Sequence, residues 1–154
     1  MRALLAQIPS DYSSVRAQRE ALLSHRDNSR ALATLGLLYQ RSSTFEIANR
    51  YFKEALSGSG AREDDRLREQ LTFGIAMNEG RLSDWKAAPK RLEEFGAAFP
   101  SSPLMDQVLY TFVVADVRQK KTKEARQHLA ELRTAFPESS LLAQANRLVE
   151  GQGK

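Results

Sequence analysis

The side chains able to carry out catalysis or hold a metal ion are few and widely separated in this sequence. The chain has two histidines and no cysteine, which excludes thiolate chemistry and disulfides. His25 and His128 are far apart, and neither has a second ligand at metal-site spacing on its own helix face. Glu93 and Glu94 are adjacent, so on a helix they point about 100° apart and cannot act as a carboxylate dyad. We therefore expect no enzymatic activity, no metal and no cofactor.

A further candidate for chemistry is the stretch 57–60, which reads Ser-Gly-Ser-Gly. It lacks the lysine and hydroxyl residue that follow in a nucleotide-binding loop, and no apolar strand precedes it. We interpret it as a loop. The acidic run 63–65 then enters a helix, whose N-terminus favours negative charge.

The densest basic cluster is the run 118–123, Arg-Gln-Lys-Lys-Thr-Lys, followed by Arg126. The net charge of +4 makes an anionic partner worth considering. No aromatic residue interleaves with the cluster to stack on bases. We interpret it mainly as a polar turn with lysines near a helix C-terminus, where they interact well with the helix dipole. Nucleic-acid binding through residues 118–126 is kept as the weakest alternative.

The composition is ordinary for a globular domain, with 154 residues of which 42% are hydrophobic and 27% charged. No apolar run is long enough to cross a membrane, and the first ten residues lack the hydrophobic region of a secretion signal. We expect one domain over residues 1–154, without membrane insertion. The expected location is the cytoplasm, or the periplasm if a leader has been removed.

Small and apolar residues recur at helical spacing on both sides of a polar break at 41–43, within segment 29–56. This pattern predicts two helices joined by a tight turn. Gly36 and Ala48 are the small residues expected to let the two backbones approach each other. The side chains expected to fill the seam between the helices are Leu35, Tyr39, Phe52 and Ala55.

This segment resembles the tetratricopeptide repeat family, whose pattern of Leu-Gly, aromatic, Ala, aromatic and Ala is matched by Leu35, Gly36, Tyr39, Ala48, Phe52 and Ala55. A second copy places Phe73 and Gly74 in the Leu-Gly positions, with Trp85 at the turn and in the core. A third copy has Asp116 where the family has its first aromatic residue. The resemblance implies an all-α fold, an α-solenoid of stacked antiparallel helix pairs in a right-handed superhelix.

The implied organisation is a half repeat at 10–27, repeats at 29–60, 64–100 and 104–137, and a capping helix at 140–150. Residues 98–103 and 135–140 correspond almost residue for residue, a variant that looks like the repeats of bacterial envelope proteins. Pro89 conflicts with a second helix that starts at Ser83, because a proline inside a helix costs about 3 kcal/mol. That helix is either kinked or begins later.

In the repeat family, the first helix of each pair lines a concave groove. The resemblance places groove residues at Arg30, Leu37, Gln40, Arg41, Arg68, Leu71, Ile75, Asn78, Gln107, Tyr110, Val114, Val117 and Arg118. Apolar side chains with arginines at the rim suit an amphipathic helix or an extended peptide carrying some negative charge. We therefore expect a non-enzymatic module for protein–protein interaction. The alternative is a self-assembling scaffold segment of a larger bacterial complex, for example in the envelope, in which the chain forms homo-oligomers.

Overall fold

The computed structural model describes residues 28–151, so the half repeat expected at 10–27 lies outside the described residues. The described part forms eight helices and no strand, which confirms the predicted all-α fold. The helices are α3 (Asn28–Arg41), α4 (Phe45–Ser57), α5 (Ser59–Glu63), α6 (Asp65–Leu82), α7 (Ala88–Ala98), α8 (Met105–Arg118), α9 (Thr122–Ala135) and α10 (Leu142–Glu150). The chain divides into two compact units, Met1–Ile75 and Ala76–Lys154, and the boundary falls within α6.

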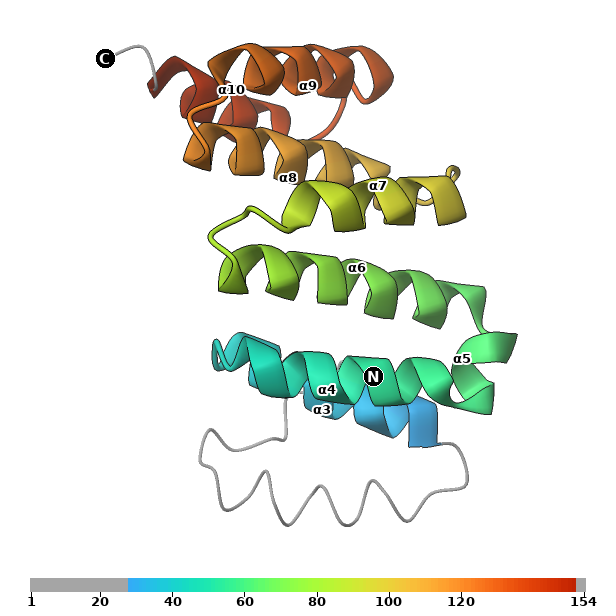
Figure 1. The fold of residues 1–154 in the computed structure, drawn as a ribbon. Helices are drawn as coiled ribbons and strands as arrows, with labels where there is room; N and C mark the ends of the chain where they lie inside the picture. The colour runs from blue at the N-terminus through green and yellow to red at the C-terminus, as the bar shows by residue number, and fades with distance from the viewer. Residues whose placement is uncertain (1–27, 152–154) are drawn as a thin grey trace. The chain divides into compact units, whose positions relative to one another are not determined.

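In the first unit, α3 and α4 pack against each other as the sequence predicts (Figure 1). The Phe52 ring is buried in the unit's core, and it lies against Gly36 of α3 and Gly74 of α6. A Cβ atom at Gly74 would lie 2.8 Å from this ring, so both glycines are required for the close approach. Ala48 is fully buried opposite Gly36, which confirms its expected role as a small residue in the seam.

The loop expected at 57–60 is wrong, because Ser57 ends α4 and Ser59 begins the short helix α5. Gly58 is the only residue between the two helices, in an extended conformation. Helix α5 packs on both α3 and α4, and Ala61 is fully buried in the same core as Phe52. The methyl group of this alanine gives a polar, glycine-containing segment one apolar contact that holds it as a helical turn.

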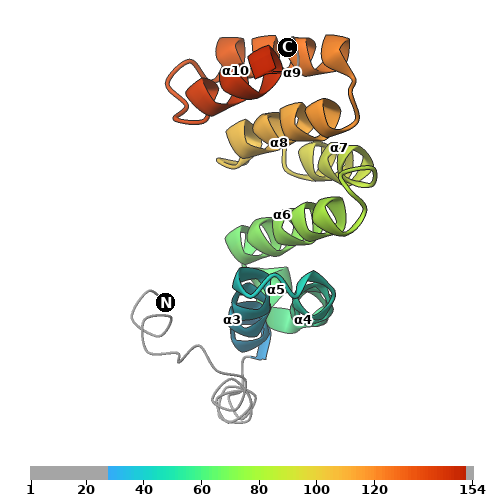
Figure 2. The same cartoon turned by 90° about the vertical axis from the view of Figure 1, so that its left-hand side faces the viewer.

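In the second unit, α8 packs against α7, α9 and α10, and α10 also packs on α9 (Figure 2). Residues from α8, α9 and α10 form one apolar core, which consists of Val113, Ala125, Leu129, Leu132, Ala145 and Val149. Val113 of α8 is fully buried in this core. None of the described helices combines the length and the apolarity needed to cross a bilayer.

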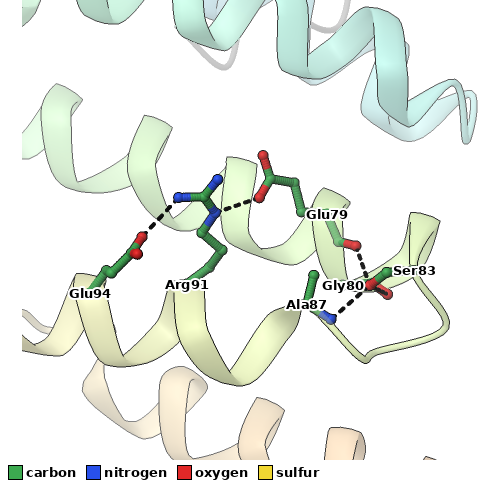
Figure 3. Close-up of polar contacts among 6 residues, drawn as sticks. All are labelled: Glu79, Gly80, Ser83, Ala87, Arg91 and Glu94. Atoms are coloured by element: carbon green, nitrogen blue, oxygen red, sulfur yellow. Dashed lines mark hydrogen bonds and ion pairs between the residues drawn. The ribbon is translucent and has the colours of Figure 1, made fainter.

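Pro89 lies in the first turn of α7, because that helix begins at Ala88. Proline is well tolerated there, since the first amides of a helix have no partner within the helix. The residues before α7 form a turn held by Ser83, whose hydroxyl donates to the Glu79 carbonyl over 2.7 Å and accepts from the Ala87 amide over 2.9 Å (Figure 3). The second helix of the pair therefore begins later than the repeat pattern suggests. Its close approach to α6 is at Gly80, where an added Cβ atom would lie 2.9 Å from the Cβ of Ala88.

The turns that join α3 to α4 and α8 to α9 have the same backbone structure. The Thr44 amide donates to the Tyr39 carbonyl over 2.9 Å, and the Lys121 amide donates to the Asp116 carbonyl over 2.8 Å. The residue before each donor is left-handed, with φ of 58° in the first turn and 59° in the second. Aligned on these turns, the corresponding positions are Tyr39 and Asp116, Ser43 and Lys120, Thr44 and Lys121, Glu46 and Lys123, and Tyr51 and His128.

The two Phe-Pro segments that correspond in sequence also share one local structure. Between α7 and α8, the Ser102 hydroxyl accepts from the Leu104 amide over 3.2 Å. Between α9 and α10, the Ser139 hydroxyl accepts from the Leu141 amide over 3.3 Å. The second unit therefore uses the same connection twice.

Candidate binding surface

Five of the residues expected in the groove lie on one face of α8, which we call the α8 face. Gln107, Tyr110, Val114 and Val117 follow each other at the three- and four-residue spacing that places side chains on one side of a helix, and Arg118 is four residues after Val114. Gln107 and Arg118 are exposed, and the three residues between them are half-buried. Tyr110 and Val117 also pack against the core of the second unit. The buried residues of α8 are Val108, Thr111, Val113, Ala115 and Asp116.

The accessible side of α9 has a different character from the α8 face. Its exposed positions are charged or polar apart from two alanines, and they are Lys123, Glu124, Arg126, Gln127, Ala130, Glu131, Arg133, Thr134 and Ala135. Helices that only face water carry such residues on their outer side. A helix whose accessible side presents a tyrosine and two valines is more typical of a contact surface.

The groove residues predicted in the first unit are distributed between its surface and its core. Arg30 and Arg41 are exposed, and Leu37 and Gln40 are half-buried. Arg30 forms an ion pair with Asp64 over 3.0 Å. The half-buried Leu37 packs against the core cluster that contains Phe52.

Leu71 and Ile75 belong to this same cluster, with 2% and 8% of their surface exposed. They offer little area to a partner, and a role at the border of a groove stays a prediction for them. Arg68 is half-buried and forms an ion pair with Asp65 over 2.6 Å. Asn78 of the second unit is completely buried.

Electrostatic effects at the surface are modest and have identifiable causes. Burial raises the pKa of the Tyr110 phenol above its ordinary value, because the charged phenolate is poorly solvated there. Hydrogen bonds to Glu94 and Glu79 raise the pKa of Arg91, which bridges α7 and α6 (Figure 3). The pKa of the Asp64 carboxyl is lowered, first by the Leu67 amide and then by Arg30.

One pair of chemically active side chains was missed by the sequence reasoning. Asp116 of α8 lies 2.7 Å from Nδ1 of His128 in α9, and His128 also stacks on Phe112, with ring centroids 4.7 Å apart. His128 is therefore half-buried and has partners on both sides of its ring. The search for a partner on the same helix could not find Asp116, because the two residues meet only when the turn between the helices closes. Aligning the two turns finds the pair, because Asp116 and His128 then correspond to Tyr39 and Tyr51, whose rings stack on each other.

Within residues 28–151, the Asp116–His128 pair does not belong to a larger group of side chains that could hold a metal ion. No group of three or more histidine, aspartate or glutamate side chains with metal-binding geometry exists among residues 28–151. Comparisons of the chain with family models, with curated proteins and with solved structures gave no match.

Proposed function

We propose that this chain is a non-enzymatic interaction module of the tetratricopeptide type, in which a segment of a partner protein docks on the α8 face. The observation that carries the proposal is the contrast between α8 and α9. Helix α8 packs against α7, α9 and α10, and Tyr110, Val114 and Val117 stay half-buried, with Tyr110 and Val117 partly against the core of the second unit and partly accessible. A strip of this kind fits the apolar side of an amphipathic helix, with anchors about one turn apart.

The repeated backbone supports the solenoid part of the proposal. The same helix-to-helix turn occurs after α3 and after α8, and the same serine-containing connection occurs before α8 and before α10. Recurrence of one turn and one connection along a chain is typical of repeat proteins, whose helix pairs stack on their neighbours. In the repeat family, such stacking leaves the first helices facing the partner.

The test is selection of a displayed library of random peptides, about four helical turns long, on the full chain. Val114→Glu places a charge in the centre of the α8 face, and the matched control is Ala130→Glu, an exposed alanine of α9. We expect the wild type and Ala130→Glu to retain the same peptides and Val114→Glu to lose them, with helical circular dichroism preserved in all three. Equal binding by Val114→Glu would overturn the proposal.

A crosslinking measurement keeps the test decisive if Val114→Glu fails to fold. A photoreactive phenylalanine at position 114 should crosslink to a selected peptide, and the same residue at position 130 should not. Sedimentation of the wild type without any peptide examines the alternative of self-assembly. If the mass of the wild type grows with concentration and that of Val114→Glu does not, the partner on the α8 face is a second copy of the chain and not a peptide.

A further inference from the structure

The turn between α8 and α9 carries five basic residues, which we call the basic turn: Arg118, Lys120, Lys121, Lys123 and Arg126. All five are exposed, and none has an ion pair within the part of the chain that the structure describes. Asp116, the nearest acid before the turn, is buried and held by His128. By contrast, Arg30, Arg68 and Arg91 each pair with a carboxylate. Glu124 is the one acidic residue within 118–126, and it forms no ion pair with the five basic residues. The basic turn is thus a concentrated positive charge that is only partly offset.

The backbone of the turn does not require these cations. The turn between α3 and α4 has the same hydrogen bonds and the same left-handed residue, but it carries Ser43, Thr44 and Glu46 where the basic turn has three lysines. A serine, a threonine and a glutamate therefore serve this backbone equally well.

Two of the lysines also stand where helix stability disfavours them. Lys121 is the N-cap of α9 without a side-chain cap bond, and Lys123 lies in the first turn of that helix. The N-terminal end of a helix carries partial positive charge, so cations there are unfavourable and acidic residues are favoured. The C-terminal dipole of α8 accounts for Arg118 and Lys120 alone. A benefit outside the fold is needed to explain Lys121 and Lys123.

The basic turn is held in a fixed position, which favours binding. The Lys121 amide donates to the Asp116 carbonyl, and the side-chain amide of Gln119 donates to the Trp85 carbonyl over 3.0 Å. A cluster whose backbone is already ordered loses less conformational entropy when it meets a partner. Arg118 belongs both to this turn and to the α8 face, so the apolar strip runs directly into the cluster.

We infer that the partner segment on the α8 face continues into a block of acidic residues that lies over the basic turn. This inference rests on the proposed function of the α8 face. An acidic protein segment is favoured over single-stranded nucleic acid because residues 118–126 contain no aromatic side chain on which bases could stack. It is favoured over a membrane surface because the exposed residues of the turn include no apolar side chain that could insert into lipid.

The experiment compares two charge-reversal variants in the full chain. Lys121→Glu with Lys123→Glu alters the basic turn, and Lys86→Glu with Lys90→Glu makes the same charge change at two exposed lysines before and within α7. Peptides selected on the wild type should be enriched in aspartate and glutamate at one end. Their Kd should weaken at least about fivefold in the first variant and stay within about twofold in the second.

The outcomes separate this inference from the proposed function. Selected peptides could require Val114, show no acidic block and bind the basic-turn variant with unchanged Kd. In that case the acidic block is wrong, and docking on the α8 face is still supported. If the wild type selects no peptide, both fail. Duplex DNA and vesicles containing phosphatidylserine are tested as direct probes. Tighter binding of either one than of the acidic peptides, abolished by the basic-turn variant, would overturn the inference in favour of that partner.

Discussion

The carboxylate of Asp116 and the imidazole of His128 meet at 2.7 Å, at the place in their helix pair where the Tyr39 ring stacks on Tyr51 in the other pair. The two pairs occupy the same positions relative to turns with the same backbone. An aromatic stack in one helix pair is thus replaced by a polar pair in the other. The Asp116 side chain is only 6% exposed, so it depends on its partner for solvation.

Replacing His128 by alanine should reduce the stability of the second unit. It leaves a buried carboxylate without its hydrogen-bond partner, which costs about 1–3 kcal/mol of unfolding free energy. Urea denaturation followed by circular dichroism measures the change. The control is Gln127→Ala on the exposed side of the same helix, for which we expect a change within about 0.5 kcal/mol. Equal stability of both variants would mean that the Asp116–His128 contact carries no weight in the fold.

The sequence predicted the first helix pair well because the packing of this pair depends on the sizes of residues that lie close together in the sequence. Gly36 and Ala48 were expected to bring the backbones together, and the structure places them against each other across the seam. Helical periodicity sufficed for this step, since a small residue facing a small residue determines the register of two adjoining helices.

Other features depended on contacts that periodicity does not encode. Helix α5 exists because Ala61 reaches the core of the first unit, although its own sequence reads as a loop. The sequence places Gly74 in the Leu-Gly positions of the second copy, and only the folded chain shows that a side chain there would meet Phe52 of α4. The α8 face was predicted by resemblance, whereas the burial of Leu71 and Ile75 followed from a core that only the folded chain assembles.

Gly36→Ala should destabilise the first unit although alanine favours helix formation. An added methyl group would collide with the Phe52 ring, and overpacking of this kind costs about 1–3 kcal/mol. Gly96 of α7 provides the control, because a Cβ atom there meets only the Met105 methyl at 3.7 Å. Gly96→Ala should therefore stabilise the protein by up to about 1 kcal/mol. Thermal unfolding of the two variants should move in opposite directions, and a stabilised Gly36→Ala would contradict the close packing around Phe52.

Titration of Tyr110 should report on the α8 face. Its pKa is raised in the folded chain above the ordinary value of 10.0, because burial disfavours the phenolate. The unfolded chain therefore ionises first. The stability that this phenol contributes is fully present below the ordinary pKa and is lost as the pH rises through the raised pKa of the folded state.

Phenolate absorbance of the wild type minus that of Tyr110→Phe isolates this titration from the other tyrosines. We expect a bound peptide to raise the pKa further, since docking on the α8 face removes more water from the ring. Peptides that bind tightly without moving the Tyr110 titration would place the docking surface elsewhere. Tyr110→Phe itself should bind peptides normally, because the proposed contact uses the ring and not the hydroxyl.

Reversing the charge of Lys121 and Lys123 should slightly stabilise the chain while it weakens the proposed partner. Glutamate near the N-terminus of α9 interacts favourably with the helix dipole, by about 0.3–1 kcal/mol, as Glu46 does in the first turn of α4. Urea denaturation at low and high salt measures the gain, which should shrink as salt screens the charges. A clear loss of stability would show that the lysines serve the fold after all. A gain in stability together with weaker binding would support a role of the two lysines in partner binding. The lysines would then destabilise helix α9 slightly and stabilise the complex.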